Sequence, residues 1–189
     1  MRIIAGSNKG ARIFAPKGDD TRPTGDRARE AAFNLIGPVD GAAVLDLFAG
    51  SGAMGLEALS RGAASAVFVE SDRDACRTID RNLDKLRLTG ARVVQQDAVR
   101  ALAAEAAAGR RYDLVLVDPP YEMFSSLQNG LSKYLPAVLA KDGLVVVETG
   151  ARGEPELPPL SKRTSRRYGS ARITLFQLES GGGGAVETP

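Results

Sequence analysis

The sequence predicts an α/β fold with a mostly parallel, seven-stranded sheet that carries helices on both faces. Short apolar runs alternate with helical patterns through most of the chain, and each crossover between parallel strands lays a helix on the sheet. The apolar runs are nearly continuous, which is typical of strands buried on both faces. The chain has 189 residues, of which 43% are hydrophobic and 25% charged. This is enough for one ordinary globular domain.

The chain opens with an expected β-hairpin extension. Residues 2–6 and 11–15 are short and β-prone, and the turn-forming sequence SNKG lies between them. A polar loop follows over residues 16–23. From Asp26 the sequence RAREAAFNLIG is periodic and predicts a helix, which Gly37 can end.

A regular alternation of strands and helices follows. The strands are expected at 43–48, 66–70, 92–96, 112–118 and 143–149. The helices are expected at 52–62, 72–90, 98–109 and 124–140. Pro136 limits or bends the last of these helices near its end.

The C-terminal part departs from this alternation. The β-prone runs 164–168 and 171–178 flank Gly169 and Ser170, which predicts a hairpin that closes the sheet with antiparallel strands. The Gly-rich end has no core-forming residues and is expected to be a flexible tail. The predicted organisation is a single domain over residues 1–179, with an extension at 1–20, a core at 21–179 and a tail at 180–189.

The composition of the chain excludes several classes of functional site. The chain has one cysteine, Cys76, and no histidine. An internal disulfide is therefore impossible, and a zinc site or a histidine-based catalytic triad is not expected. No apolar run reaches the ~20 residues of a membrane span, and the N-terminus lacks the apolar stretch of a signal peptide. We expect a cytoplasmic protein that binds neither metal nor membrane.

Basic residues gather near both ends of the chain, although the net charge is only +2. They form either two solvated faces or one phosphate-binding surface assembled from both chain ends. The candidates for such a surface are Arg2, Lys9, Arg12, Lys17, Lys162, Arg163, Arg166 and Arg167.

A glycine-rich turn follows the first strand of the alternation. The sequence LDLFAGSGAMGLEA places Gly50, Gly52 and Gly55 between a strand and a helix. The spacing fits the G-x-G-x-x-G dinucleotide fingerprint, and Glu70 ends the next strand where a ribose-binding acid is expected. NAD is therefore one interpretation of this motif, and a simple tight turn is another.

Two further acids favour a different nucleoside cofactor. Asp46 lies just before the glycines, where a pyrophosphate would gain nothing from an added negative charge. An acid suits a ligand with a cationic end and no phosphate, such as S-adenosylmethionine, which carries an ammonium and a sulfonium. Asp97 ends the third strand of the alternation and is placed to contact an adenine amino group. A helix cap is the alternative role for any one of these acids.

The fourth strand of the alternation ends in an acid, two prolines and an aromatic residue: Asp118, Pro119, Pro120 and Tyr121. The prolines fix φ and remove two backbone donors, so the loop offers mainly hydrogen-bond acceptors. Acceptors can hold an exocyclic amino group and stabilise the positive charge that develops when the nitrogen is alkylated. Tyr121 can stack on a base. The alternative is a proline-rich turn with a capping aspartate.

The glycine motif together with DPPY resembles the Rossmann-like class I S-adenosylmethionine-dependent N-methyltransferases. The opening IIAGSNKGARI, the segment RPTGDRAREAAFN (22–34) and the VDPPY box closely resemble the bacterial RsmD family. Members of this family methylate the exocyclic N2 of one guanine, guanine 966, in 16S rRNA of the small ribosomal subunit. The likeness runs from about Arg2 to Leu178.

The resemblance implies roles for individual residues. Binding of S-adenosylmethionine is implied for Arg22, Pro23, Thr24, Arg27, Asp46, Phe48, Ala49, Gly50, Ser51, Gly52, Glu70, Ser71, Asp97, Ala98 and Asp118. Asp118 to Tyr121 would hold the target guanine, and the basic residues at both chain ends would grip the RNA. The implied partner is 16S rRNA, within the small subunit or an assembly intermediate, and we expect a monomer.

Other functions stay open on the sequence alone. The same acceptor loop serves adenine N6 in DNA or RNA, and a related loop serves protein glutamine, although a large domain for reading DNA bases is missing. An NAD-dependent dehydrogenase would leave the DPPY loop unexplained. A non-enzymatic RNA-binding protein would leave Asp46 and Glu70 without a role.

Overall fold

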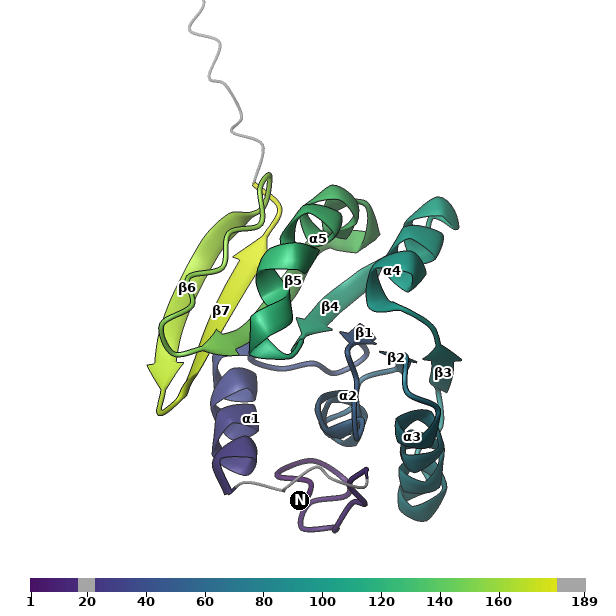
Figure 1. Ribbon diagram of the computed structural model, residues 1–189. Coiled ribbons are helices and arrows are strands. Elements are labelled where there is room, and N and C mark those ends of the chain that lie inside the picture. Colours follow the sequence, from purple (N-terminus) through teal and green to yellow (C-terminus); the bar gives the residue numbers. More distant parts are fainter. Residues whose placement is uncertain (17–22, 180–189) are drawn as a thin grey trace, which may run out of the picture.

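The computed structural model describes residues 1–16 and 23–179. For Pro23 and Thr24 it describes the backbone only. Its centre is a seven-stranded sheet in the order β3-β2-β1-β4-β5-β7-β6 (Figure 1). The strands are β1 (Ala43–Leu47), β2 (Ser65–Glu70), β3 (Ala91–Gln95), β4 (Tyr112–Val117), β5 (Leu139–Gly150), β6 (Ser161–Tyr168) and β7 (Ala171–Gln177). β1 to β5 pair in parallel, whereas β7 pairs antiparallel with both β5 and β6. The predicted fold class is confirmed.

Helices cover both faces of the sheet, as Figure 1 shows. α4 and α5 lie on one face, and α1, α2 and α3 lie on the other. The helices are α1 (Pro23–Ile36), α2 (Ala53–Ser60), α3 (Arg73–Leu86), α4 (Ala98–Ala107) and α5 (Phe124–Val138), with a short 3-10 turn, η1 (Tyr121–Met123), before α5.

The alternation of side chains along the strands divides the core in two. Val44 and Leu114 pack on the side of α1 to α3, together with Phe33, whereas Leu45 and Val115 pack on the side of α4 and α5. These strands are buried on both faces because each successive side chain points to the opposite face. Two apolar layers therefore hold the carboxyl ends of the parallel strands in fixed positions.

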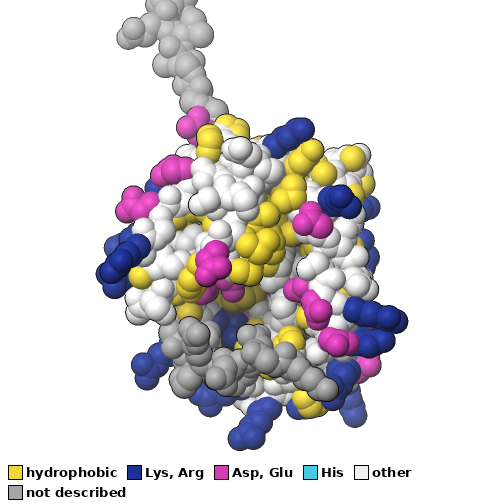
Figure 2. Space-filling view, viewed as in Figure 1, with side chains coloured by type: hydrophobic (Ala, Val, Ile, Leu, Met, Phe, Trp, Pro, Cys, Tyr) yellow, Lys and Arg dark blue, Asp and Glu magenta, His cyan; other side chains and the backbone are white. Residues whose placement is uncertain are grey.

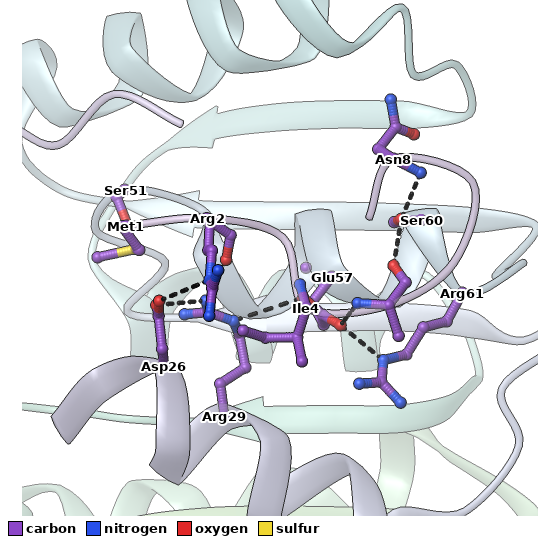
Figure 3. Close-up of polar contacts among 12 residues, drawn as sticks. Met1, Arg2, Ile4, Asn8, Asp26, Arg29, Ser51, Glu57, Ser60 and Arg61 are labelled. Carbon is purple, nitrogen blue, oxygen red and sulfur yellow. Dashed lines mark hydrogen bonds and ion pairs between the residues drawn. The ribbon is translucent and has the colours of Figure 1, made fainter. Parts of the chain in front are cut away.

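The N-terminal segment reverses direction as predicted, but it does not form the strands expected at 2–6 and 11–15. The two arms still pair as an irregular hairpin, through an antiparallel bridge between Arg2 and Arg12 and three backbone hydrogen bonds, from the Ile3 N–H to the Ala11 carbonyl, from the Gly10 N–H to the Ile3 carbonyl and from the Ile13 N–H to the Met1 carbonyl. Other backbone groups of the segment bond to side chains of the core. The N–H groups of Ile4 and Ala5 donate to the buried carboxylate of Glu57 at 2.8 and 3.0 Å (Figure 3). The segment is therefore fastened onto α2.

Some element boundaries differ from those expected. α1 begins at Pro23 instead of Asp26, which suits a proline because the first helical N–H needs no partner within the helix. β5 extends over residues 139–150, and β6 begins at Ser161. Pro136 lies inside α5. The predicted tail at 180–189 lies outside the described residues.

Candidate functional site

A cleft of about 710 Å³ lies at the carboxyl ends of the parallel strands. Open α/β sheets bind ligands at this edge, because the loops that leave neighbouring strands diverge there. The cleft is lined by Met1, Gly25, Arg29, Asp46, Phe48, Ala49, Gly50, Ser51, Ala53, Met54, Val69, Glu70, Ser71, Gln96, Asp97, Ala98, Asp118, Pro119, Pro120, Tyr121, Met123 and Glu148.

The structure brings most of the predicted site residues together in this cleft. The predicted cofactor residues that line it are Asp46, Phe48, Ala49, Gly50, Ser51, Glu70, Ser71, Asp97, Ala98 and Asp118. All four residues of the predicted catalytic loop, Asp118 to Tyr121, line it as well. Residues from four strand ends, which lie far apart in the sequence, therefore share one hollow.

Other predicted residues lie elsewhere. Gly52 is the N-cap of α2 and does not line the cleft. Arg27 is exposed and lines a separate hollow with Arg2 and Lys9. Lys17 and Arg22 lie outside the described residues, and the side chains of Pro23 and Thr24 are also outside the description.

The glycine turn brings α2 close to the sheet. Gly52 has φ 79°, a left-handed conformation that favours glycine. At Gly55 an added Cβ would lie 2.3 Å from Cε1 of Phe68, so a larger residue would push the helix away from β2. Gly50 has φ 54°, and a Cβ there would meet nothing within 4 Å. The backbone at Gly50 therefore leaves open space for a ligand.

Asp46 is a buried acid behind this turn. Its side chain is 2% exposed, and its Oδ2 accepts a hydrogen bond from the Gly55 N–H at 2.9 Å. Burial raises the pKa of Asp46 from 3.8 to about 7, and the nearby negative charge of Glu70 adds to the shift. A cationic group in the cleft would favour the charged form of Asp46.

Glu70 and Asp97 both organise backbone at strand ends. Glu70 accepts from the Gly50 N–H at 2.8 Å through Oε2 and from the Asp72 N–H at 2.8 Å through Oε1. Asp97 caps α4, with Oδ1 accepting from the Arg100 N–H at 2.9 Å. The cap does not exclude ligand binding, because a carboxylate has about four acceptor sites.

The loop after β4 forms one wall of the cleft. Asp118 is exposed and Pro119 is buried. The Pro120 carbonyl accepts from the Met123 N–H at 2.8 Å, which begins the turn η1. Tyr121 is 49% exposed and lines the cleft.

Sequence reasoning missed Glu148 on the neighbouring strand. Glu148 lies near the end of β5, and its Oε1 accepts a hydrogen bond from the Tyr121 hydroxyl at 3.2 Å. Burial raises its pKa above the ordinary range of a glutamate, which the hydrogen bond from Tyr121 partly offsets. The signal was present, because Glu148 follows the apolar run LVVV just as Asp118 follows LVLV.

Arg29 was also missed, although it lies in the segment 22–34 that carries the family resemblance. It lies within α1, where an arginine suggests a solvated helix face, yet its side chain is only 4% exposed. Among the described lining residues it is the one basic side chain, beside the acids Asp46, Glu70, Asp97, Asp118 and Glu148. The remaining lining residues that were not predicted are Met1, Gly25, Ala53, Met54, Val69, Gln96 and Met123.

Figure 2 shows the acidic side chains of this face (magenta) beside a band of hydrophobic side chains (yellow) that crosses its middle, with the basic side chains (blue) mostly at the rim. The cleft lining thus presents mainly acidic and apolar groups. Within residues 1–16 and 23–179, no three side chains are grouped to hold a metal ion. No helix in this part of the chain is long and apolar enough to cross a bilayer.

The basic residues of β6 are not equivalent. β6 runs parallel to β5, because β7 lies between them and pairs antiparallel with both. Through Ile173 of β7, Arg166 lies in register with Glu148, which lines the cleft. Lys162 lies further from this edge and pairs with Glu156 at 2.6 Å. Arg166 and its neighbour Arg167 are therefore nearer to the cleft.

Comparisons with known proteins find relatives over nearly the whole chain. The family described as conserved hypothetical protein 95 matches residues 1–177. Ribosomal RNA small subunit methyltransferase D of Escherichia coli is 37% identical over 191 residues, covering 96% of this chain and 92% of the relative. The protein YlbH of Bacillus subtilis is 44% identical over 185 residues, covering 94% and 98%. The solved structure of yhhF from Escherichia coli matches with TM-score 0.79 and 36% identity, covering 95% of this chain and 98% of that chain.

Proposed function

The chain belongs to the family described as conserved hypothetical protein 95, the RsmD family, and from this premise we propose that it methylates 16S rRNA of the small ribosomal subunit. The methyl donor is S-adenosylmethionine. The acceptor is the exocyclic N2 amine of a single guanine, of the guanine 966 type. The name of the Escherichia coli relative supports the RNA substrate, and the chemistry of the cleft supports an amine as the methyl acceptor.

The cleft suits this donor better than it suits NAD. Its described lining carries five acids and one basic side chain, Arg29. A pyrophosphate would meet repulsion from these acids, whereas an ammonium and a sulfonium would meet attraction. The open space at Gly50 allows a nucleoside to approach the backbone. Asp46, Glu70 and Asp97 would then each meet a different part of the cofactor.

The cofactor supplies a methyl group activated by its positively charged sulfur. The residues of the chain position the methyl donor and the acceptor amine and place charges beside them. No covalent bond to the enzyme forms in this mechanism. Cys76 is buried in α3 and is not among the residues of the cleft, so it offers no nucleophile there.

Asp118 is the residue assigned to the reacting amine. The lone pair of a base amino group is shared with the ring, which makes the nitrogen a weak nucleophile. A carboxylate that accepts its hydrogens favours tetrahedral geometry and stabilises the positive charge that develops on the nitrogen. The prolines that follow fix the loop backbone, and Tyr121 stacks on the base and sets its plane.

The target base has to leave its stack to reach this loop. Basic residues on β6 and in the N-terminal segment would hold the surrounding RNA by its phosphates, which gives an affinity that falls with salt. The substrate is 16S rRNA, within the small subunit or an assembly intermediate, and such a protein is expected in the cytoplasm as a monomer.

One observation carries the proposal: Asp118 to Tyr121 and the three acids of the preceding strand ends line the same cleft. The test is to incubate the protein with labelled S-adenosylmethionine and small subunits from cells that lack the enzyme, and then to map the labelled nucleoside. N2-methylguanosine at one position of 16S rRNA is the expected product. Label in adenine, in protein or nowhere would refute it.

A further inference from the structure

Arg29 is a buried cation in an acidic cleft, and neither the glycine turn nor the acceptor loop explains it. Its side chain is 4% exposed, yet it is one of the residues that line the cleft. A charge that is removed from water needs compensation. The buried guanidinium of Arg29 therefore needs negatively charged partners.

Part of that compensation comes from the protein. Nη2 of Arg29 donates to Oδ1 of Asp26 at 2.8 Å and to the carbonyl of Arg2 at 2.5 Å. Nε lies 3.5 Å from Oε2 of the buried Glu57. Figure 3 shows the Arg29 side chain between Asp26, Arg2 and Glu57. These contacts hold the guanidinium in one orientation.

The compensation is incomplete. Nε is buried without a hydrogen-bond partner, since its contact with Glu57 is an ion pair and not a hydrogen bond. All the contacts of Arg29 with described residues involve Nη2 or Nε, so Nη1 has no acceptor among these residues. The fixed guanidinium thus keeps donors that no described residue satisfies, and Arg29 is one of the residues that line the cleft.

We propose that Arg29 binds the carboxylate of the amino-acid end of the cofactor. This inference rests on the proposed function, because it takes S-adenosylmethionine as the ligand. That ligand has a single anionic group, its carboxylate, and the described cleft lining has a single cationic side chain. Guanidinium and carboxylate form short, strong, charge-assisted hydrogen bonds.

Two other roles fit the structure less well. An RNA phosphate would need an accessible cation, and Arg29 is almost fully buried. Arg27, for which the family resemblance implied cofactor binding, is exposed and lines a different hollow. Arg29 is therefore the residue that selects a ligand with a carboxylate, and Arg27 is not.

The test compares two ligands that differ in the amino-acid portion. S-adenosylhomocysteine carries the carboxylate, whereas 5′-methylthioadenosine lacks the whole amino-acid end. Titration calorimetry would measure the affinity of each for the wild-type chain and for Arg29→Met, which removes the charge and keeps much of the volume. Arg29→Met should lose roughly 10- to 100-fold in affinity for S-adenosylhomocysteine, the range expected for a charged hydrogen bond. Its affinity for 5′-methylthioadenosine should stay unchanged.

Two further variants serve as controls for this interpretation. Arg27→Met is the matched control and should bind both ligands like the wild type. If Arg29→Met fails to fold because Glu57 loses a partner, the double variant Arg29→Met with Glu57→Gln replaces it, since removing both charges of a buried pair is tolerated better than removing one. The double variant should show the same selective loss.

The outcomes separate this inference from the proposed function. An equal loss for both ligands would assign Arg29 a structural role only and overturn the inference. A selective loss in Arg27→Met, and not in Arg29→Met, would overturn it as well. If the wild-type chain binds neither ligand, the proposed cofactor is wrong and the inference is overturned together with it.

Discussion

The hydroxyl of Tyr121 donates a hydrogen bond to Oε1 of Glu148 at 3.2 Å, which ties the loop after β4 to the end of β5. The ring also lies near Gly150, since a Cβ added at Gly150 would lie 3.3 Å from Cδ2 of Tyr121. The hydrogen bond to Glu148 thus orients the ring while 49% of the residue stays exposed.

The first prediction separates stacking from orientation. Tyr121→Ala removes the ring, and we expect a loss of roughly 5- to 100-fold in kcat/KM for the RNA, since stacking on a base contributes about 1–3 kcal/mol. Tyr121→Phe keeps the ring and removes the hydroxyl that bonds to Glu148, which predicts a smaller loss, up to roughly 10-fold. Initial rates of methyl transfer measure both. Equal rates for the two variants would contradict the stacking role.

The second prediction concerns Asp118 and the chemical step. Asp118→Ala should lower kcat by roughly 100- to 1000-fold, the effect of removing one group that stabilises charge in the transition state. The affinity for S-adenosylhomocysteine should change little, because the other acids of the cleft remain. Asp142→Ala is the matched control, an exposed acid on β5 outside the cleft. Turnover of Asp118→Ala at the wild-type rate would refute the role given to the loop.

Features that depend on local sequence pattern could be predicted, whereas features that depend on contacts between residues far apart in the sequence could not. The sheet and the glycine turn could be predicted because periodicity and glycine spacing determine them. The attachment of the N-terminal segment to α2 could not, because the N–H groups of Ile4 and Ala5 bond to Glu57, which lies far away in the sequence. Arg29 was missed for the same reason: its burial depends on Glu57 and on the carbonyl of Arg2.

The third prediction follows from the pKa of Asp46, which burial raises from 3.8 to about 7. A raised pKa means that the folded state holds this proton more tightly than the unfolded state. The stabilisation is complete below pH 3.8 and is lost as the pH rises towards 7. Asp46→Asn does not titrate and keeps an acceptor for the Gly55 N–H.

Urea unfolding at several pH values tests this third prediction. Other titrating groups affect the wild type and Asp46→Asn alike, so the difference between their free energies of unfolding isolates Asp46. Between about pH 5 and pH 7 the wild type should lose about 2 kcal/mol relative to Asp46→Asn. Parallel curves for the two proteins would show that the pKa of Asp46 is not raised in the folded state.

The fourth prediction uses the register of β6. Arg166 lies in line with Glu148 at the cleft, whereas Lys162 lies further along the strand and pairs with Glu156. Replacing Arg166 and Arg167 with Ala should therefore weaken RNA binding more than replacing Lys162 and Arg163. Each lost phosphate contact also lowers the slope of log K against log salt by roughly 0.7–0.9.

The control for this fourth prediction removes two charges from surfaces away from the cleft edge. Lys133 is exposed on α5, and Lys141 is exposed near the amino end of β5, opposite the cleft edge. Replacing both with Ala changes the net charge by the same amount as the Arg166 and Arg167 pair, so any general electrostatic effect is matched. Filter binding at several salt concentrations should give a wild-type slope for this control and a slope lower by about 1.4–1.8 for the arginine pair. Equal slopes for the arginine pair and for the Lys133 and Lys141 control would show that Arg166 and Arg167 do not contact phosphates. They would then be ordinary solvent-exposed charges on an edge strand.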